Sequence, residues 1–143
     1  MFDAILTPVD GSELSLDAAN DAIELAASHG AELHILYVIE VLPTFTKQGG
    51  SILAQDEEHP AQREYGEQLT GELADQATDA GVDVVTALKS GTPSHVITDY
   101  AKRNELDLIV MGTYGRAGVR DRLVGSTTER VLRESPISVL AVR

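Results

Sequence analysis

The chain has 143 residues, no cysteine and a formal net charge of -12 at pH 7. This length predicts one domain whose core needs neither disulfides nor metals, and the lack of cysteine excludes a disulfide framework, a thiolate metal site and a cysteine nucleophile. The negative charge disfavours nucleic acid and anionic membranes as partners. No apolar segment is long enough to span a bilayer, and no basic segment precedes the first apolar run, so we expect a cytoplasmic protein without a signal peptide.

The choice of charged residues is uneven. Lysine occurs only at Lys47, Lys89 and Lys102, whereas aspartate and glutamate together number 23. Such an acidic, lysine-poor composition resembles that of proteins from salt-loving organisms, and an ordinary acidic cytosolic protein is the alternative. We favour the halophilic interpretation, which predicts neither a ligand nor a reaction.

The start of the chain alternates strand and helix signals. Residues 3–9 form a short apolar run typical of a central strand, and residues 31–39 form a second run of this kind. Between them, Ser12 can cap a helix over residues 13–29, and Gly30 can end it. The apolar residues of this helix share one face, as expected for a helix that packs on a sheet.

Residues 40–59 do not continue this pattern. They combine Pro43, the pair Gly49 and Gly50, and an acidic run at residues 56–58, which predicts a long loop. Such a loop either contacts a partner or is an insertion without a role of its own.

The rest of the chain returns to alternation. Pro60 suits the first position of a helix that runs to residue 80, and Thr92 followed by Pro93 predicts a helix over residues 93–104. Apolar runs at residues 82–89, 106–111 and 137–142 predict three more strands. Ser126 and Glu129 match the capping box S-x-x-E, so we expect Ser126 to cap a last helix that ends near residue 135.

This order of elements predicts an α/β fold. We expect an open, doubly wound, five-stranded parallel sheet with helices on both faces. In such sheets ligands bind beyond the carboxyl ends of the strands, where the strand order reverses. If the strand order is 3-2-1-4-5, the reversal lies between the first and fourth strands, which end near Asp10 and Gly112.

A glycine-punctuated segment follows the fourth predicted strand. Gly112 and Gly115 are followed, after nine residues, by Gly125, Ser126 and Thr127 at the start of the last predicted helix. Glycine lets the backbone approach a ligand closely, and amides at a helix N-terminus attract anions, so we interpret this segment as a phosphate cradle. The alternative is a tight turn in which Ser126 is only a cap. The P-loop pattern with its lysine is absent, and so is G-x-G-x-x-G after the first strand.

At these residues the chain resembles the universal stress protein family, in its ATP-binding branch. The motif G-x-x-G-x9-G-[ST] is matched by Gly112, Gly115, Gly125 and Ser126, and residues 8–12 and 135–140 match as well. The resemblance covers essentially the whole chain. It implies a flavodoxin-like relative of the Rossmann fold, of the adenine nucleotide alpha hydrolase-like type, with strand order 3-2-1-4-5. It also implies a homodimer joined through the fifth strand, residues 137–142.

The resemblance further implies where ATP, or a related adenine nucleotide, would bind. Pro8, Val9 and Asp10 would line the adenine and ribose side, and the backbone of Val38 would border the adenine. Met111 would lie beneath the nucleotide. The phosphates would be held by the loop after the fourth strand and the start of the last helix: Gly112, Thr113, Tyr114, Gly115, Arg116, Gly118, Gly125, Ser126 and Thr127. Where Tyr114 stands, many relatives carry histidine, so the case for a side-chain contact is weaker there while the backbone cradle is unaffected.

Several side chains near the motif have two interpretations. Asp10 could bind ribose hydroxyls, or a divalent cation through water, or form only a turn. Arg116, Arg120 and Arg122 could approach phosphate or lie in a solvated loop, and we favour phosphate for Arg116 alone.

No side chain stands out for catalysis. The histidines have no metal-ligand spacing, so each is interpreted as structural: His29, His34, His59 and His95. Ser12, Ser94 and Ser126 lie at helix starts rather than on a G-x-S-x-G elbow, so none is a candidate nucleophile. We find no acid–base pair with defensible geometry.

We therefore expect a dimeric, ATP-binding regulatory module that signals nucleotide status to a partner protein. Mg²⁺ could accompany the nucleotide, and no metal ligands are assigned. A slow ATPase or phosphotransfer enzyme is a second hypothesis, ranked lower because no residue is poised as a general base. A dimer that binds no nucleotide is a third, and the glycine motif argues against it.

Overall fold

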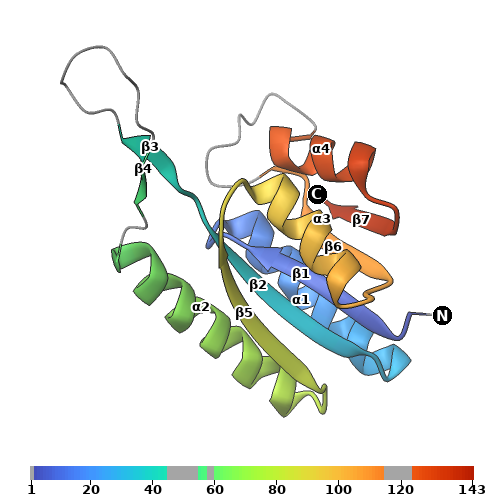
Figure 1. Ribbon diagram of the computed structural model, residues 1–143. Helices are drawn as coiled ribbons and strands as arrows, with labels where there is room; N and C mark the ends of the chain where they lie inside the picture. The colour runs from blue at the N-terminus through green and yellow to red at the C-terminus, as the bar shows by residue number, and fades with distance from the viewer. Residues whose placement is uncertain (1, 45–54, 58–59, 115–123) are drawn as a thin grey trace, which may run out of the picture.

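The computed structural model describes residues 2–44, 55–57, 60–114 and 124–143 (Figure 1). Within these residues, five parallel strands form one sheet: β1 (Ala4–Val9), β2 (Glu32–Ile39), β5 (Val84–Ser90), β6 (Leu108–Gly112) and β7 (Ser138–Val142). Their spatial order is β5-β2-β1-β6-β7. Counted along the chain, this is the order 3-2-1-4-5, so the predicted fold class is confirmed.

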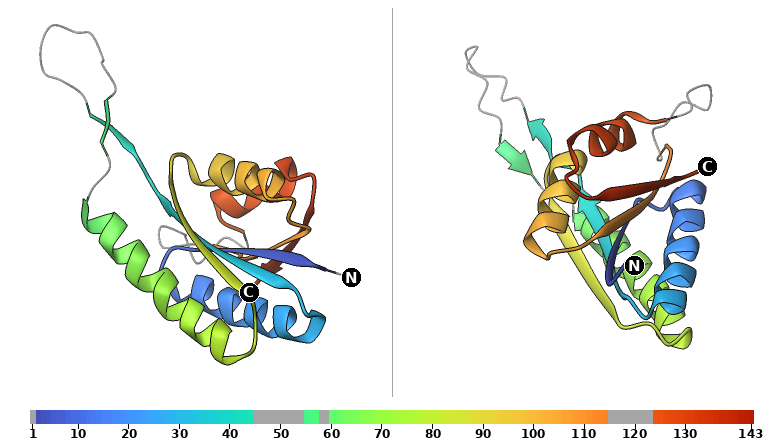
Figure 2. Two further views of the ribbon diagram at one scale, coloured as in Figure 1. Left: turned by 60° about the horizontal axis from the view of Figure 1, so that its bottom comes forward. Right: turned by 90° about the vertical axis from the view of Figure 1, so that its right-hand side faces the viewer.

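Helices cover both faces of the sheet (Figure 2). The helices α1 (Glu13–His29) and α2 (Pro60–Asp79) pack on one face, and α3 (Pro93–Arg103) and α4 (Ser126–Glu134) pack on the other. As predicted, Ser12 caps α1, and Gly30 follows its last turn with a positive φ of 64°. In the part of the chain that the structure describes, no helix combines the length and apolarity needed to cross a membrane.

Residues 40–59 are not one irregular loop, so this prediction was wrong where the structure describes the segment. The strands β3 (Leu42–Thr44) and β4 (Gln55–Glu57) pair antiparallel, with Leu42 opposite Glu57. Figure 1 shows this ribbon standing away from the main sheet. Pro43 restricts Leu42 to extended backbone, which suits a strand. Three residues are too few to show an alternating pattern in the sequence.

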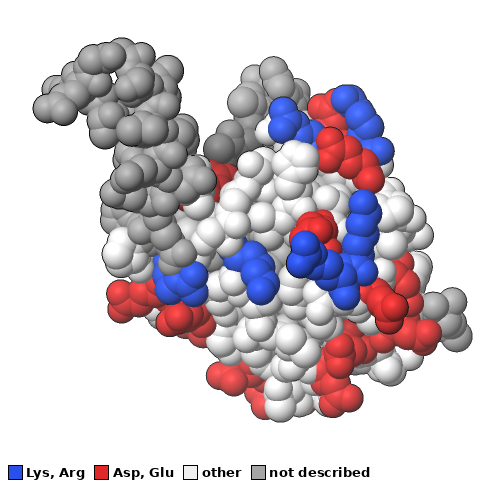
Figure 3. Space-filling model, viewed as in Figure 1, with Lys and Arg blue, Asp and Glu red and all other residues white. Residues whose placement is uncertain are grey.

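The net negative charge is concentrated on one layer of helices. Four acidic residues lie on α1 and five on α2, against a single arginine on α2. The helices α3 and α4 together carry three acidic and four basic residues. Figure 3 shows the face that carries α3 and α4, where basic side chains alternate with acidic ones. The layer formed by α3 and α4 is therefore close to neutral.

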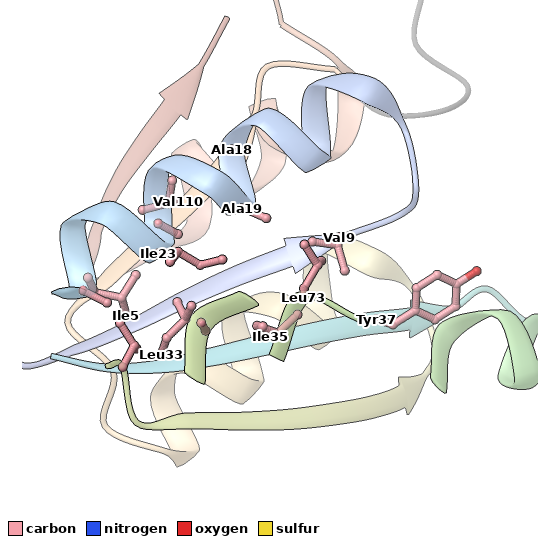
Figure 4. Close-up of a cluster of buried hydrophobic side chains, with 14 of the residues drawn as sticks. Ile5, Val9, Ala18, Ala19, Ile23, Leu33, Ile35, Tyr37, Leu73 and Val110 are labelled. Carbon is pink, nitrogen blue, oxygen red and sulfur yellow. The ribbon is translucent and has the colours of Figure 1, made fainter. Parts of the chain in front are cut away.

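The core consists of two clusters, one on each face of the sheet. Leu33 and Ile35 of β2 point toward α1 and α2, whereas Leu36 points toward α3 and α4, as the alternation of a strand requires. Figure 4 shows Ala18 and Ala19 of α1 within the first cluster. These small side chains let α1 approach the sheet closely. Tight packing on both faces fixes the carboxyl ends of the central strands.

Candidate functional site

The ladder between the two central strands β1 and β6 is short. β1 pairs with β2 as far as Val9, but it pairs with β6 only at Ile5 and Leu6. Beyond that point, the hydroxyl of Thr7 donates to the carbonyl of Val110 at 2.9 Å. We call the region beyond this hydrogen bond, at the carboxyl ends of the two strands, the β1/β6 junction. The strand order reverses here, and open α/β sheets bind ligands at such a point.

The β1 side of the junction is held by its own side chains. Asp10 Oδ1 accepts a hydrogen bond from Ser12 N at 2.9 Å, and Asp10 N donates to Ser15 Oγ at 3.3 Å. Asp10 thus forms a turn, and its contact with ribose stays a prediction. The side chains of Pro8 and Val9 are buried, so their backbone is the part that could face a ligand.

The β6 side of the junction is packed against neighbouring elements. Met111 is buried in the cluster beneath α3 and α4. A Cβ on Gly112 would lie 3.1 Å from Leu14 Cγ and 3.2 Å from the Leu14 backbone, so glycine here lets β6 pack against α1. The sequence-based reason for Gly112, close approach to a ligand, is not needed to explain it. Thr113 is also buried, and its amide donates to the carbonyl of Val142 at 2.8 Å.

The helix α4 begins differently from the prediction. Its N-cap is Gly125, no side chain makes a capping hydrogen bond, and Ser126 is the first helical residue. Glu129 Oε1 accepts a hydrogen bond from Arg133 at 2.6 Å instead of reaching back to the cap. The predicted capping box is therefore wrong. The reason is a contact between distant residues, because Gly125 N donates to the carbonyl of Thr113 and this holds Gly125 in extended backbone.

This start leaves backbone donors at the junction. The first hydrogen bond of the helix runs from Glu129 N to Gly125 O at 2.9 Å. The amides of Ser126, Thr127 and Thr128 precede it, so helical geometry gives them no acceptor within α4. Such amides, together with the helix dipole, attract anions. The arrangement can therefore hold a phosphate by main-chain hydrogen bonds.

Sequence reasoning missed Thr128. Its side chain is 2% exposed, and its hydroxyl donates to the carbonyl of Gly112 at 2.7 Å. This hydrogen bond joins the first turn of α4 to the end of β6. The local pattern does not separate Thr128 from its half-buried neighbour Thr127. The only available signal was helical spacing, which places Thr128 on the same face as the buried Val131.

The remaining predicted site residues fall into two groups. Val38 is half-buried and follows Tyr37, the partner of Val9 in β2, so the end of β2 flanks the junction. Tyr114 is half-buried and follows β6 by two residues. Outside the described residues lie Gly115, Arg116, Gly118, Arg120 and Arg122.

A buried histidine links β2 to α3. His34 Nδ1 lies 2.7 Å from Tyr100 Oη, and His34 Nε2 lies 2.6 Å from Glu32 Oε1. Burial, and then the charge of Glu32, raise the pKa of Tyr100. We therefore assign His34 to the packing of α3 on the sheet. Within the described ranges, no group of three or more histidine, aspartate and glutamate residues could hold a metal ion.

A model of the universal stress protein family matches residues 1–143. The chain belongs to the universal stress protein family. The family predicted from the glycine motif is thus confirmed, whereas the ATP-binding branch stays a prediction.

Three relatives show how close this similarity is. The universal stress protein MJ0531 of Methanocaldococcus jannaschii is 33% identical over 145 residues, covering 100% of this chain and 83% of that protein. The solved structure of UspA from Lactobacillus plantarum has 30% identity and a TM-score of 0.70, covering 99% of this chain and 98% of that chain. The structure of a universal stress protein in complex with cAMP has 26% identity and a TM-score of 0.73, covering 99% and 97%.

Proposed function

We propose that this universal stress protein binds an adenine nucleotide at the β1/β6 junction and acts as a nucleotide-binding regulatory module. The start of α4 carries the proposal. Three amides without a helical acceptor lie beside the end of β6, at the point where the strand order reverses. A phosphate placed there would accept their hydrogen bonds and interact favourably with the helix dipole.

The base would lie on the side of the junction that faces β2. Val38 and Met111 both contact the apolar cluster beneath α3 and α4, and they offer an apolar border for a purine ring. The backbone of Pro8 and Val9 would complete this side, and we assign the ribose to Asp10. Hydrogen bonds to the base would come from the backbone of Val38, because its side chain has no donor or acceptor.

A relative supports adenine nucleotides as the class of ligand, and the glycine motif of this chain favours one member of that class. A universal stress protein of similar fold has been solved in complex with cAMP, which contains adenine, ribose and phosphate. Within this class we choose ATP, because the motif formed by Gly112, Gly115, Gly125 and Ser126 is complete. Arg116, Gly118 and the residues around them would then contact the outer phosphates. Mg²⁺ would be held through these phosphates and water rather than by a protein cage.

We further propose that β7 joins two copies of the chain. β7 is an edge strand of the sheet, and Leu140 on this strand is 42% exposed. Unpaired backbone groups and exposed apolar side chains on an edge favour pairing with another strand. Light scattering on the purified protein is expected to give the mass of a dimer, and the mass of a monomer would contradict this part of the proposal.

The nucleotide proposal is tested on the purified full chain. Mass spectrometry of the material released on denaturation identifies any nucleotide that co-purifies. Nucleotide-free protein is then titrated by calorimetry with ATP, AMP, cAMP and, as a control for the base, GTP. We expect the adenine nucleotides to bind, ATP most tightly, and GTP to bind at least tenfold more weakly. A protein that binds none of them, or that binds GTP as well as ATP, contradicts the proposal.

A further inference from the structure

The connection between β6 and α4 is tied at its base by hydrogen bonds between described residues. Thr113 N donates to Val142 O, Gly125 N donates to Thr113 O, and Thr128 Oγ1 donates to Gly112 O. These bonds join the start of α4 to the end of β6, and the end of β6 to β7. Two of the three are made by backbone amides, so Thr128 contributes the one that depends on a side chain.

We infer that Thr128 is a positioning residue for phosphate binding, an inference that rests on the function proposed above. Its hydroxyl holds the first turn of α4 against the end of β6 and so sets where the amides of Ser126 and Thr127 point. The side chain is 2% exposed and the hydrogen bond measures 2.7 Å, so the contact is shielded from water and well formed. Thr128 itself need not touch the ligand with its side chain.

We expect the loss of the Thr128 hydroxyl to weaken the binding of phosphate and to leave the binding of adenine unchanged. Several amides bind one phosphate group only when all of them point at it together, so a small rotation of the first turn weakens every bond at once. A site that is held ready before the ligand arrives loses less free energy on binding than one that must be ordered. The proposed adenine border at Val38 and Met111 lies on strands, so a rotation confined to the first turn of α4 leaves its backbone in place.

The chain offers a matched control in α2. Thr70 is also 2% exposed, and its hydroxyl donates to Gly66 O at 2.8 Å. Valine at either position keeps the branched shape and removes the donor. Both substitutions therefore delete one buried hydroxyl of the same kind, but the hydroxyl of Thr70 donates within α2, a helix that packs on β2 and β5.

The experiment compares ATP with adenosine, which shares the base and ribose and lacks phosphate. We expect Thr128→Val to weaken ATP binding about tenfold, which corresponds to about 1.4 kcal/mol, and to leave adenosine binding unchanged. Thr128→Ser restores the donor and is expected to bind ATP within about twofold of the wild type. Thr70→Val is expected to lower the melting temperature and to leave both affinities unchanged. Calorimetry gives the affinities, and circular dichroism gives the melting curves.

The outcomes separate this inference from the function on which it rests. Wild-type affinity for ATP in Thr128→Val overturns it, and so does an equal loss of ATP and adenosine binding, because that pattern indicates a general structural role. If the valine variant does not fold, Thr128→Ala deletes the same donor with a smaller side chain and is judged by the same comparison. A wild-type protein that binds neither ligand refutes the proposed function itself, and this inference with it.

Discussion

The helices α1 and α4, which follow the two strands of the junction, differ in how their N-termini are capped. After β1, Asp10 Oδ1 accepts a hydrogen bond from Ser12 N, and Ser12 Oγ accepts one from Ser15 N, so the start of α1 has a side-chain cap. After β6, the N-cap of α4 is Gly125, which has no side chain to offer. One of the first three amides of α1, that of Ser15, thus has a side-chain acceptor, whereas the first three amides of α4 have no acceptor within the helix.

This difference indicates which helix can bind an anion. A side-chain cap competes with a ligand for the same amides, so a capped helix start is a poor phosphate site even when its dipole is favourable. Two helices of the same sheet, with N-termini at the same edge, therefore differ in what they can do. One residue, Ser12 in the first case and Gly125 in the second, accounts for most of the contrast.

The largest expected effect comes from giving α4 the kind of cap that α1 has. In Gly125→Asp, the carboxylate would accept hydrogen bonds from the first amides of α4 and repel phosphate. We expect the dissociation constant for ATP to rise about 100-fold, which corresponds to about 2.7 kcal/mol. The cap favours the helix, whereas the added Cβ would lie 3.1 Å from Tyr114 Cα, so we expect little net change in the free energy of unfolding. Calorimetry measures the affinity, and urea unfolding measures the stability.

Two further variants separate the causes of this effect. A Cβ at Gly125 would lie 3.1 Å from Tyr114 Cα, so Gly125→Ala tests the steric contribution alone. Gly125→Asn adds a capping side chain without charge. We expect the loss of affinity to increase from alanine to asparagine to aspartate. If Gly125→Asp binds ATP as tightly as the wild type, the open start of α4 is not the phosphate site.

A smaller effect is expected when the two serines are compared. Ser12→Ala removes a capping oxygen that accepts from Ser15 N at 3.2 Å, and should lower the free energy of unfolding by about 1 kcal/mol. Ser126→Ala removes an exposed hydroxyl from the first helical residue, and should change it by less than about 0.5 kcal/mol. Urea unfolding measures both. Ser12→Asp, which keeps a cap, is the control, and equal losses at Ser12 and Ser126 would contradict the assigned caps.

The same pair of serines shows how far the sequence could lead. Each stands at the start of an apolar-patterned helix, and local rules favour both as caps. The prediction is confirmed for Ser12, whose partners lie within five residues. It is wrong for Ser126, because the start of α4 is set by bonds from Gly125 and Thr128 to residues at the end of β6. Local chemistry is readable from a single sequence, whereas contacts between distant segments are not.

The glycines of the motif illustrate the same limit. The pattern was sufficient to predict the family and the fold, and the structure then places Gly112 at the end of β6 and Gly125 at the start of α4. It could not show that Gly112 makes room for Leu14 of α1, or that Gly125 packs against Tyr114. A missing side chain is compatible with a close ligand and with a close neighbour, and only the folded arrangement distinguishes them. For the buried hydroxyl of Thr128, the only signal in the sequence was its helical spacing from Val131.

The helices α1 and α4 also differ in how their charged side chains are spaced. Along α1, exposed acidic residues stand three or four positions apart, which makes like-charge pairs of Glu13 with Asp17, Asp17 with Asp21, and Asp21 with Glu24. Along α4, Glu129 and Arg133 form an opposite-charge pair at 2.6 Å. Each such pair is worth about 0.2–0.5 kcal/mol, unfavourable on α1 and favourable on α4. Salt screens both, so the three pairs on α1 should outweigh the one on α4.

The smallest expected effect is therefore a rise in stability with salt. Raising KCl from about 0.1 M to about 1 M shortens the Debye length from about 10 Å to about 3 Å, which removes most of the repulsion on α1. A net gain of roughly 0.5 kcal/mol corresponds to a melting temperature about 2 °C higher. The variant Asp17→Asn removes two of the three like-charge pairs, so its melting temperature should respond less to KCl than that of the wild type. If both proteins respond equally, the repulsion lies elsewhere on the acidic surface. A melting temperature that falls with KCl would contradict the halophilic interpretation. In that case favourable ion pairs would contribute more to stability than self-repulsion costs.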